Sequence, residues 1–509
     1  MENNNQLKSG VFLSYINLAV GMLIPIFYTP VMLRMLGQAE YGLYALANSV
    51  IAYLSLLSFG FGTTIIRYIS KYRAEGNQIE LEKVFGFFLK LYMGIAIAVM
   101  ACGIGIAFNL EPIFGRGLTT EETAKMKVLV LVMAVHSALA FPVSVYSSMI
   151  VAHERFIFRR VIDILSSVAA PVANLIVLYL GFASIGMAVA STIVEIIIVP
   201  ANIIYCQKTL RIRPRFERIP QSLVKEMIGV SAFHFLGSIV DMLFWATDKV
   251  ILGMLASTVA VAVYNVGGTF NNMVMSLTQC ISGVMVPRVT MMVFQKESEP
   301  NQLTDVFIKI GRIQFLIIGL IVSGFSVFGQ EFINMWAGDD YANSFWVAVL
   351  TMYPLCIPLM QNIGVSIISA QNKHQFRSVV YLIVAIINVI TTYILVPRYG
   401  VIAAAMCSCG AYLLGHGVIM NLYYYKVTQI DIPMFWRNIG SMAVVPACMT
   451  FAGLYVKKVI PIDNWLVFFA GVGIFATVYA VLMLRFALNE YEKKLLIEPL
   501  IKIARKKVI

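Results

Sequence analysis

Fourteen long apolar runs constrain this 509-residue chain more than any other feature. A helix of about 20 apolar residues crosses roughly 30 Å of hydrocarbon. Because 60% of the residues are hydrophobic and 13% are charged, a soluble core could not bury this surface. The predicted segments are 9–33, 42–66, 84–108, 126–150, 161–180, 183–205, 226–252, 259–286, 307–329, 343–369, 378–397, 400–424, 434–456 and 464–488. The sequence therefore predicts an all-α polytopic membrane protein with about 14 transmembrane helices.

An internal repeat divides these segments into two groups. The sequence AHERFIFR at 152–159 returns as AQNKHQFR at 370–377, and the apolar runs that follow end at Gly181 and Gly400. Such a repeat is typical of two-lobed transporters with a cavity between the lobes, and six intervening spans give both lobes one orientation. The predicted organisation is an N-terminal six-helix lobe (1–207), a basic cytoplasmic linker (208–224), a pseudo-symmetric C-terminal six-helix lobe (225–426), and two extra helices with a basic tail (427–509).

The basic residues predict the orientation of these helices. Of the 38 Lys and Arg residues, 29 fall at the N-terminus, on alternate loops or in the C-terminal tail, all on one side of the membrane, and eight fall on the other side. Cytoplasmic loops carry an excess of Lys and Arg, so both termini are predicted to be cytoplasmic. This bias also accounts for the net charge of +12 without a nucleic-acid partner.

The seventh segment carries a stripe of polar residues at positions 231, 234, 238, 241, 245 and 248. Steps of three and four residues place them on one helical face. A charge at mid-helix costs about 2.5 to 3.5 kcal/mol on insertion scales, which favours a cavity or a lobe contact over lipid. Asp241 could carry a proton, bind sodium or pair with a cation, and His234 could titrate with it. The alternative is a stripe of hydrogen bonds between helices.

Other intramembrane polar residues allow the same two interpretations. Glu195 is either an ion-coupling site or a hydrogen-bonded structural carboxyl. Lys90 either holds a substrate phosphate or extends to the cytoplasmic surface. Arg34, near the outer end of the first segment, either extends to the surface there or faces the cavity. The amide side chains of Asn48, Asn265 and Asn272 suit either a hydroxyl-rich cargo or hydrogen bonds between helices. The candidate substrate-binding or cavity-lining residues are Arg34, Asn48, Lys90, His234, Ser238, Trp245, Lys249, Asn265 and Asn272, and the candidate ion-coupling residues are Asp241, Glu195 and Asp248.

The sequence contains no nucleotide-binding loop, nucleophile elbow or metal-spaced Cys/His cluster. We therefore expect no enzymatic activity, no cofactor and no metal. Energy for transport would come from an ion gradient, the membrane potential or the substrate concentration. The largest extracytoplasmic loop, about 109–124, is too short for a catalytic domain, which counts against a membrane-embedded polysaccharide polymerase or acyltransferase.

Four segments resemble a known family. RMLGQAEYGLYALA at 34–47 and GFGTTIIR at 60–67 are similar to the start of Wzx-type polysaccharide flippases, which belong to the multidrug/oligosaccharidyl-lipid/polysaccharide exporter superfamily. ATDKVILG at 246–253 and VYNVG at 263–267 form a second similar element. The resemblance extends over essentially the whole chain in helix count and lobe pattern.

The resemblance implies a transporter in the bacterial plasma membrane. It would move an undecaprenyl-pyrophosphate-linked oligosaccharide from the cytoplasmic to the outer leaflet by alternating access, coupled to H+ or Na+, beside polysaccharide polymerase machinery. By analogy with lipid II flippases, the two extra helices would form a groove for the lipid tail. The alternative within the superfamily is an ion-coupled multidrug or cation antiporter, against which the thirteenth and fourteenth segments count.

Overall fold

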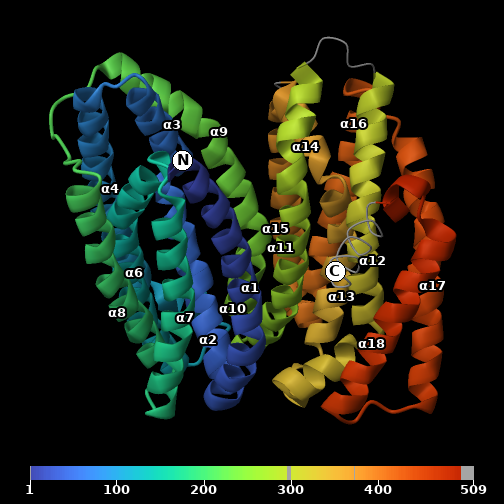
Figure 1. Ribbon diagram of the computed structural model, residues 1–509. Helices are drawn as coiled ribbons and strands as arrows, with labels where there is room; N and C mark the ends of the chain where they lie inside the picture. The colour runs from blue at the N-terminus through green and yellow to red at the C-terminus, as the bar shows by residue number, and fades with distance from the viewer. Residues whose placement is uncertain (1, 295–299, 372, 495–509) are drawn as a thin grey trace, which may run out of the picture. The chain divides into compact units, whose positions relative to one another are not determined.

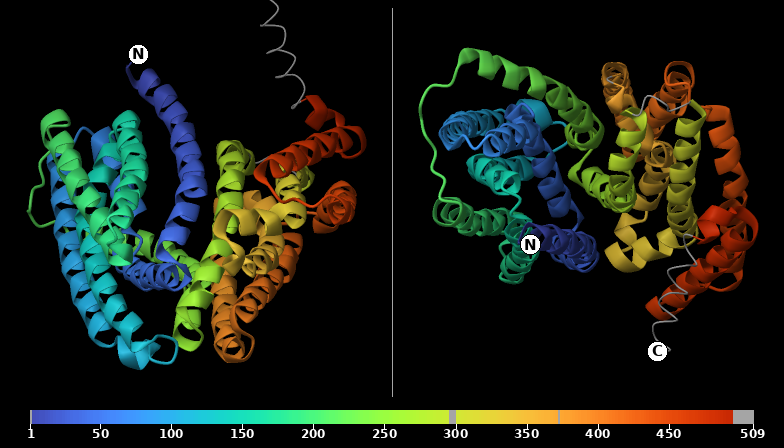
Figure 2. Two further views of the ribbon diagram at one scale, coloured as in Figure 1. Left: turned by 90° about the horizontal axis from the view of Figure 1, so that it is seen from below. Right: turned by 45° about the horizontal axis from the view of Figure 1, so that its top comes forward.

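The computed structural model describes residues 2–294, 300–371 and 373–494, and these ranges form helices and no strands (Figures 1 and 2). Twelve helical runs within them are long and apolar enough to cross a membrane. One of the twelve, Gln375–Val427, contains two predicted segments, separated by a kink at Gly400 with φ 61°. The predicted segment 259–286 lies on a further helix, Thr258–Phe294. All fourteen predicted segments therefore lie on helices, and the expected all-α polytopic membrane fold is confirmed.

The first of two compact units comprises Met1–Asn265 and Val389–Ala404. Its helices are α1 (Glu2–Leu36), α2 (Gln38–Ala52), η1 (Tyr53–Ser58), α3 (Phe61–Ala74), α4 (Gln78–Phe108), α5 (Leu110–Phe114), α6 (Thr120–Ala152), α7 (Phe156–Tyr179), α8 (Ala183–Ile204), the π-helical η2 (Tyr205–Thr209), α9 (Gln221–Trp245), α10 (Thr247–Leu255) and the first residues of α11 (Thr258–Phe294).

The second compact unit comprises Val266–Asn388 and Ala405–Ile509. It contains the rest of α11 together with α12 (Pro300–Ala337), η3 (Asp339–Tyr341), α13 (Ser344–Met360), α14 (Asn362–Ala370), most of α15 (His374–Tyr412), η4 (Leu413–Met420), α16 (Asn421–Val427), α17 (Ile432–Val459), α18 (Trp465–Leu482) and η5 (Met483–Ala487). The lobe boundaries inferred from the repeat stay a prediction.

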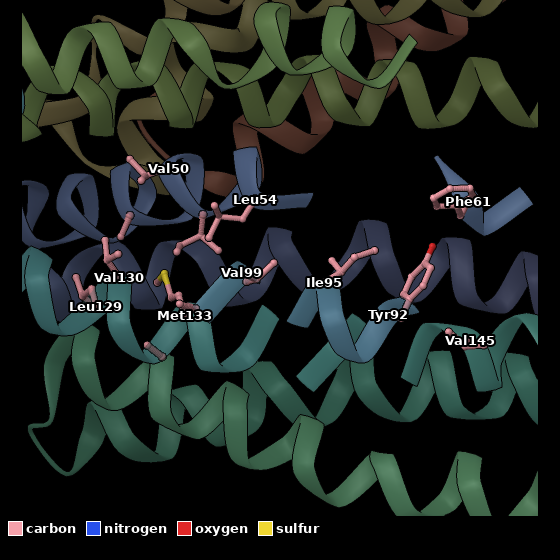
Figure 3. Close-up of a cluster of buried hydrophobic side chains, with 14 of the residues drawn as sticks. Val50, Leu54, Phe61, Tyr92, Ile95, Val99, Leu129, Val130, Met133 and Val145 are labelled. Atoms are coloured by element: carbon pink, nitrogen blue, oxygen red, sulfur yellow. The ribbon is translucent and has the colours of Figure 1, made fainter. Parts of the chain in front are cut away.

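The core of the first unit lies where α6 packs against α4 and α2 (Figure 3). Val99 of α4 and Val130 of α6 are fully buried there. The two helices approach closely at Gly103, where an added Cβ would lie 2.5 Å from the Ala134 side chain. Close packing of this kind resists deformation, so these helices form a firm support for the polar residues of the unit.

The sequence repeat is accompanied by a repeated contact. The turn between α6 and α7 follows Ala152, and its counterpart follows Ala370 between α14 and α15. In the first unit Phe158 stacks on Tyr205, with ring centroids 3.8 Å apart. In the second unit Phe376 stacks on Tyr423, at 4.3 Å. Both residues of the second pair lie 218 positions after those of the first, so the repeat preserves side-chain packing as well as sequence.

The basic linker before α9 is fixed to α4. It runs in an extended conformation along the first unit (Figures 1 and 2). The Arg215 side chain donates to the buried carboxylate of Glu82 at 2.7 Å, and its backbone N–H donates to the Glu82 carbonyl at 3.0 Å. At Gly86 an added Cβ would lie 2.0 Å from the Arg215 carbonyl oxygen. The linker therefore lies against the start of α4.

The last two helices are attached to α12 within the second unit. Arg312 of α12 is buried and forms a two-point ion pair with Glu492, which follows η5. Tyr479 of α18 donates to the Leu316 carbonyl at 2.8 Å, and Lys457 of α17 pairs with Glu331 at 2.5 Å. Three separate polar contacts thus hold this C-terminal part of the chain to one long helix.

Candidate functional site

The polar stripe of the seventh predicted segment does not follow a single helix. α9 ends at Trp245 and α10 begins at Thr247. The Thr247 hydroxyl donates to the Met242 carbonyl at 3.5 Å, and a side-chain bond of this kind competes with the regular backbone ladder. Asp248 therefore lies on α10, and the regular spacing that places residues 231–245 on one face does not set its direction.

Asp248 is completely buried near the start of α10. Its carboxylate accepts a hydrogen bond from the Tyr264 hydroxyl of α11 at 2.5 Å. The first turn of a helix also favours a negative charge, because the backbone N–H groups there point toward it. The position of this carboxylate is thus set by two neighbouring helices.

A chain of hydrogen bonds lies beside this carboxylate. The Lys249 ammonium donates to Asn265 Oδ1 at 3.3 Å, and the Asn265 amide donates to the Tyr41 hydroxyl at 2.6 Å. These residues belong to α10, α11 and α2, and Tyr41 is 4% exposed. We call Tyr41, Asp248, Lys249, Tyr264 and Asn265 the Asp248 cluster.

The Asp248 cluster joins three of the four sequence segments that carry the family resemblance. Tyr41 lies in the segment 34–47, and the other four residues lie in 246–253 and 263–267. Next to the cluster, the Tyr53 hydroxyl is hydrogen-bonded to Thr247. Three of the four segments that resemble a family in sequence are therefore joined by hydrogen bonds within the first unit.

Glycine at position 42 permits this contact between α2 and α11. An added Cβ there would lie 1.8 Å from the Thr258 carbonyl oxygen, a backbone atom that cannot rotate away. We therefore predict that Gly42→Ala forces the helices apart and costs about 2 to 3 kcal/mol of stability. Thermal unfolding of the purified protein measures this loss.

Gly21→Ala is the matched control for that substitution. Gly21 lies in α1, and an added Cβ there meets nothing within 4 Å. Alanine favours a helix over glycine by about 0.5 to 1 kcal/mol, so this variant should be as stable as the wild type or slightly more. Equal stability of the two variants would contradict the close approach at Gly42.

The α9 candidates are less buried than Asp248. His234, Ser238 and Asp241 are exposed, and Trp245 is half-buried. The Ser238 hydroxyl donates to the His234 carbonyl at 3.1 Å, within the same helix. Ser231, the first residue of the stripe, is instead buried and hydrogen-bonded to a threonine of α3 at 2.7 Å. The stripe therefore combines a helix contact at one end with an exposed polar face in its middle.

The remaining candidates are spread over other helices. Arg34 is exposed in the last turn of α1, and Lys90 is exposed on α4. Asn48 is exposed on α2 and donates to a carbonyl one turn earlier in its own helix at 3.0 Å. Glu195 is half-buried on α8, and Asn272 is exposed on the part of α11 that belongs to the second unit. Of the twelve candidates, the structure brings Asp248, Lys249 and Asn265 together.

Several residues outside the predicted candidates complete this region. Tyr41 and Tyr264 lie inside the family-like segments, where an aromatic residue is usually interpreted as packing. Thr258 at the start of α11 donates to Glu122 of α6 at 2.6 Å, and Lys125 of α6 pairs with Glu40 of α2 at 3.2 Å. The spacing of Glu122 and Lys125 after the helix-capping Thr119 is a signal for a helix start, not for these tertiary contacts.

Lys249 is the cationic group of the Asp248 cluster and is half-buried. An ammonium group has three N–H donors. Among the residues that the structure describes, it has one hydrogen-bond acceptor, Asn265 Oδ1. Donor capacity therefore remains at Lys249 for an anionic or hydroxyl-rich ligand.

The fold is that of multi-pass membrane transporters. A lipid II flippase, MurJ, in an inward closed conformation matches with a TM-score of 0.73 and 15% identity, over 93% of this chain and 97% of that one. An inward-facing multidrug resistance MATE transporter of the MOP superfamily matches with a TM-score of 0.60 and 13% identity, over 83% and 99%. A mutant of the Vibrio cholerae MATE transporter VcmN gives 0.57 and 14%, over 85% and 99%. At these identities the likeness concerns the fold alone.

A family model makes the assignment more specific. The model described as polysaccharide biosynthesis protein matches residues 7–293, which is more than half of the chain. The chain belongs to this family. Its sequence has no match among curated proteins. The resemblance to Wzx-type flippases noted from the sequence is consistent with both the family and the fold.

Proposed function

We propose that this protein moves an undecaprenyl-pyrophosphate-linked oligosaccharide from the cytoplasmic to the outer leaflet of the bacterial plasma membrane. The observation that carries this proposal is the family match over residues 7–293. The match to a lipid II flippase extends over 93% of the chain, whereas the match to a MATE transporter extends over 83%. The greater coverage by the flippase supports the proposal further. The excess of basic residues on one side supports cytoplasmic termini.

The physical problem of such transport suits the residues present. A glycan and a pyrophosphate lose their hydration in hydrocarbon, so their polar groups need replacement partners. Lys249 has unused donors for such a partner, and the exposed His234 and Ser238 of α9 offer further polar groups. Alternating access of two lobes would expose these groups to each leaflet in turn, with H+ or Na+ coupling through Asp241, Glu195 or Asp248.

The proposed function is tested by depleting the protein and locating the lipid-linked glycan. We expect the glycan to accumulate in the cytoplasmic leaflet, where it is protected from glycan-modifying enzymes added outside. Polymerised surface polysaccharide should fall at the same time, because the polymerase machinery would lack its substrate.

The second candidate function is ion-coupled export of drugs or cations, favoured by the match to MATE transporters. Depletion would then leave the glycan distribution unchanged and lower the tolerance of the cells to cationic drugs. That result would overturn the flippase proposal. A changed glycan distribution with normal drug tolerance would exclude the antiporter.

Asp241→Asn tests the ion-coupling assignment. Asp241 is exposed on α9, so the neutral amide should allow normal folding. Contacts of a carboxylate with a cation contribute about 1.5 to 3 kcal/mol, so we expect transport to slow by about tenfold or more and to lose its response to a proton or sodium gradient. Asp463→Asn, in the exposed loop before α18, is the control and should transport normally. Full, gradient-dependent transport by Asp241→Asn would remove Asp241 from the mechanism.

A further inference from the structure

An apolar pocket on the first unit shares no lining residue with the Asp248 cluster. Its volume is about 450 Å³, and its walls come from α4 and from the end of η1. The chain leaves η1 through Phe59 and Gly60, whose φ values of 48° and 69° are both left-handed. This turn directs the chain away from its helical path beside α4, and the Phe59 ring, 46% exposed, forms part of the pocket wall.

Three residues of α4 line one side of this pocket. Lys90, Gly94 and Ala98 are spaced at intervals of four residues, which places them on one side of the helix. We call this side of the pocket, where Gly94 and Ala98 are small, the channel. An added Cβ at Gly94 would meet nothing within 4 Å. Eight residues of helix extend about 12 Å, so the channel is long enough for part of an acyl chain.

Lys90 is the charged residue in the pocket lining, and the other lining residues are apolar or glycine. It is exposed and forms no hydrogen bond or ion pair with any residue that the structure describes. Lys83, two turns earlier on α4, is instead paired with Glu80 at 3.0 Å and with Glu217 of the linker at 3.3 Å. The two lysines on this helix therefore differ in that Lys83 has carboxylate partners and Lys90 does not.

Exposed apolar side chains of α4 lie beside the pocket residues in the sequence. Met93 and Ile97 of α4 are 53% and 72% exposed. Exposed apolar side chains of this kind on a spanning helix suit contact with lipid chains. Lys90 lies nearer to the basic linker, which is predicted to be cytoplasmic, and the channel extends from Lys90 toward the middle of the helix.

We propose that this pocket binds one anionic phospholipid of the cytoplasmic leaflet. The lipid phosphate pairs with the Lys90 ammonium, and one acyl chain lies along Gly94 and Ala98. The polarity of the pocket matches that of a phospholipid in this leaflet, with the charge toward the surface and the apolar part deeper. The proposal does not depend on the transported cargo.

Native mass spectrometry of the full-length protein tests this site, with phosphatidylglycerol and phosphatidylcholine added as probes in mild detergent. We expect the wild-type protein to retain phosphatidylglycerol preferentially. Lys90→Met should reduce this retention about fivefold, the effect of losing one cation near an anionic headgroup. Gly94→Leu should reduce it as well, because there is open space for an added Cβ at this position and a larger side chain would occupy the channel.

Gly105→Leu is the matched control, since Gly105 is also on α4 with open space around it. It should retain phosphatidylglycerol as the wild type does. Unchanged retention in Lys90→Met and Gly94→Leu, or equal retention of the two phospholipids by the wild type, would overturn the proposal. Copurification of a polyprenyl phosphate in place of a phospholipid would also overturn it. None of these measurements requires transport, so failure of the proposed flippase function would be distinguishable.

Discussion

Arg312→Ala is expected to lower the free energy of unfolding by about 3 to 5 kcal/mol, because it leaves the buried Glu492 carboxylate without its partner. Both side chains are buried, and Arg312 Nε and Nη2 donate to Glu492 at 2.5 and 2.8 Å. The same guanidinium donates to the carbonyls of Ala487 at 2.8 Å and Asn438 at 3.3 Å. Its loss therefore removes contacts from α12 to three other parts of the second unit. Thermal and denaturant unfolding in detergent would measure the effect.

An exposed ion pair nearby provides the control. Lys493 pairs with Glu490 at 3.3 Å, and the Glu490 side chain is 83% exposed. Exposed pairs typically contribute about 0 to 1 kcal/mol, so Lys493→Ala should change stability little. The double variant Arg312→Met with Glu492→Leu should lose less stability than Arg312→Ala, since no buried charge remains unpaired. If Arg312→Ala were no more destabilising than Lys493→Ala, the buried pair would not hold the C-terminal helices to α12.

The helices of this protein could be predicted from sequence because a membrane leaves few alternatives. Backbone polar groups in hydrocarbon must be satisfied within the spanning segment, so a long apolar run predicts a helix. The same rule does not locate interruptions inside a run. The left-handed turn at Phe59 and Gly60 and the break between α9 and α10 both lie within predicted segments. Their positions depend on local side-chain and tertiary contacts that hydropathy does not report.

Within the Asp248 cluster, a sequence can indicate contacts between helices that follow each other closely along the chain. Lys249 and Asn265 are 16 residues apart and face each other across the short connection between α10 and α11. The bond between Asn265 and Tyr41 joins residues 224 positions apart, and no spacing rule within one helix could predict it. Helical periodicity also placed Asp241 and Asp248 on one face, whereas Asp241 is exposed and Asp248 is fully buried. The break before Asp248 accounts for this difference.

Lys249→Met is expected to have the largest effect on transport, if Lys249 holds the anionic part of the substrate. Hydrogen bonds to charged groups contribute about 1.5 to 3 kcal/mol, which corresponds to a loss of roughly 10- to 100-fold in transport at low substrate. The substitution should leave the fold intact, because Lys249 donates one hydrogen bond of 3.3 Å among the described residues and methionine has a similar length. The rate at which the cell's labelled lipid-linked glycan reaches the outer leaflet measures the effect.

Two further variants separate substrate binding from a structural role of the same lysine. Lys249→Arg keeps a cation at this position and should restore much of the transport, although its planar geometry differs. Tyr41→Phe removes the hydroxyl that accepts the bond from Asn265 without removing the cation. If Lys249 acts by its charge, Tyr41→Phe should transport far better than Lys249→Met at equal amounts of protein in the membrane. Equal losses in these two variants would instead mean that the hydrogen-bond chain between α10, α11 and α2 is what transport requires, and that Lys249 contributes as one member of it.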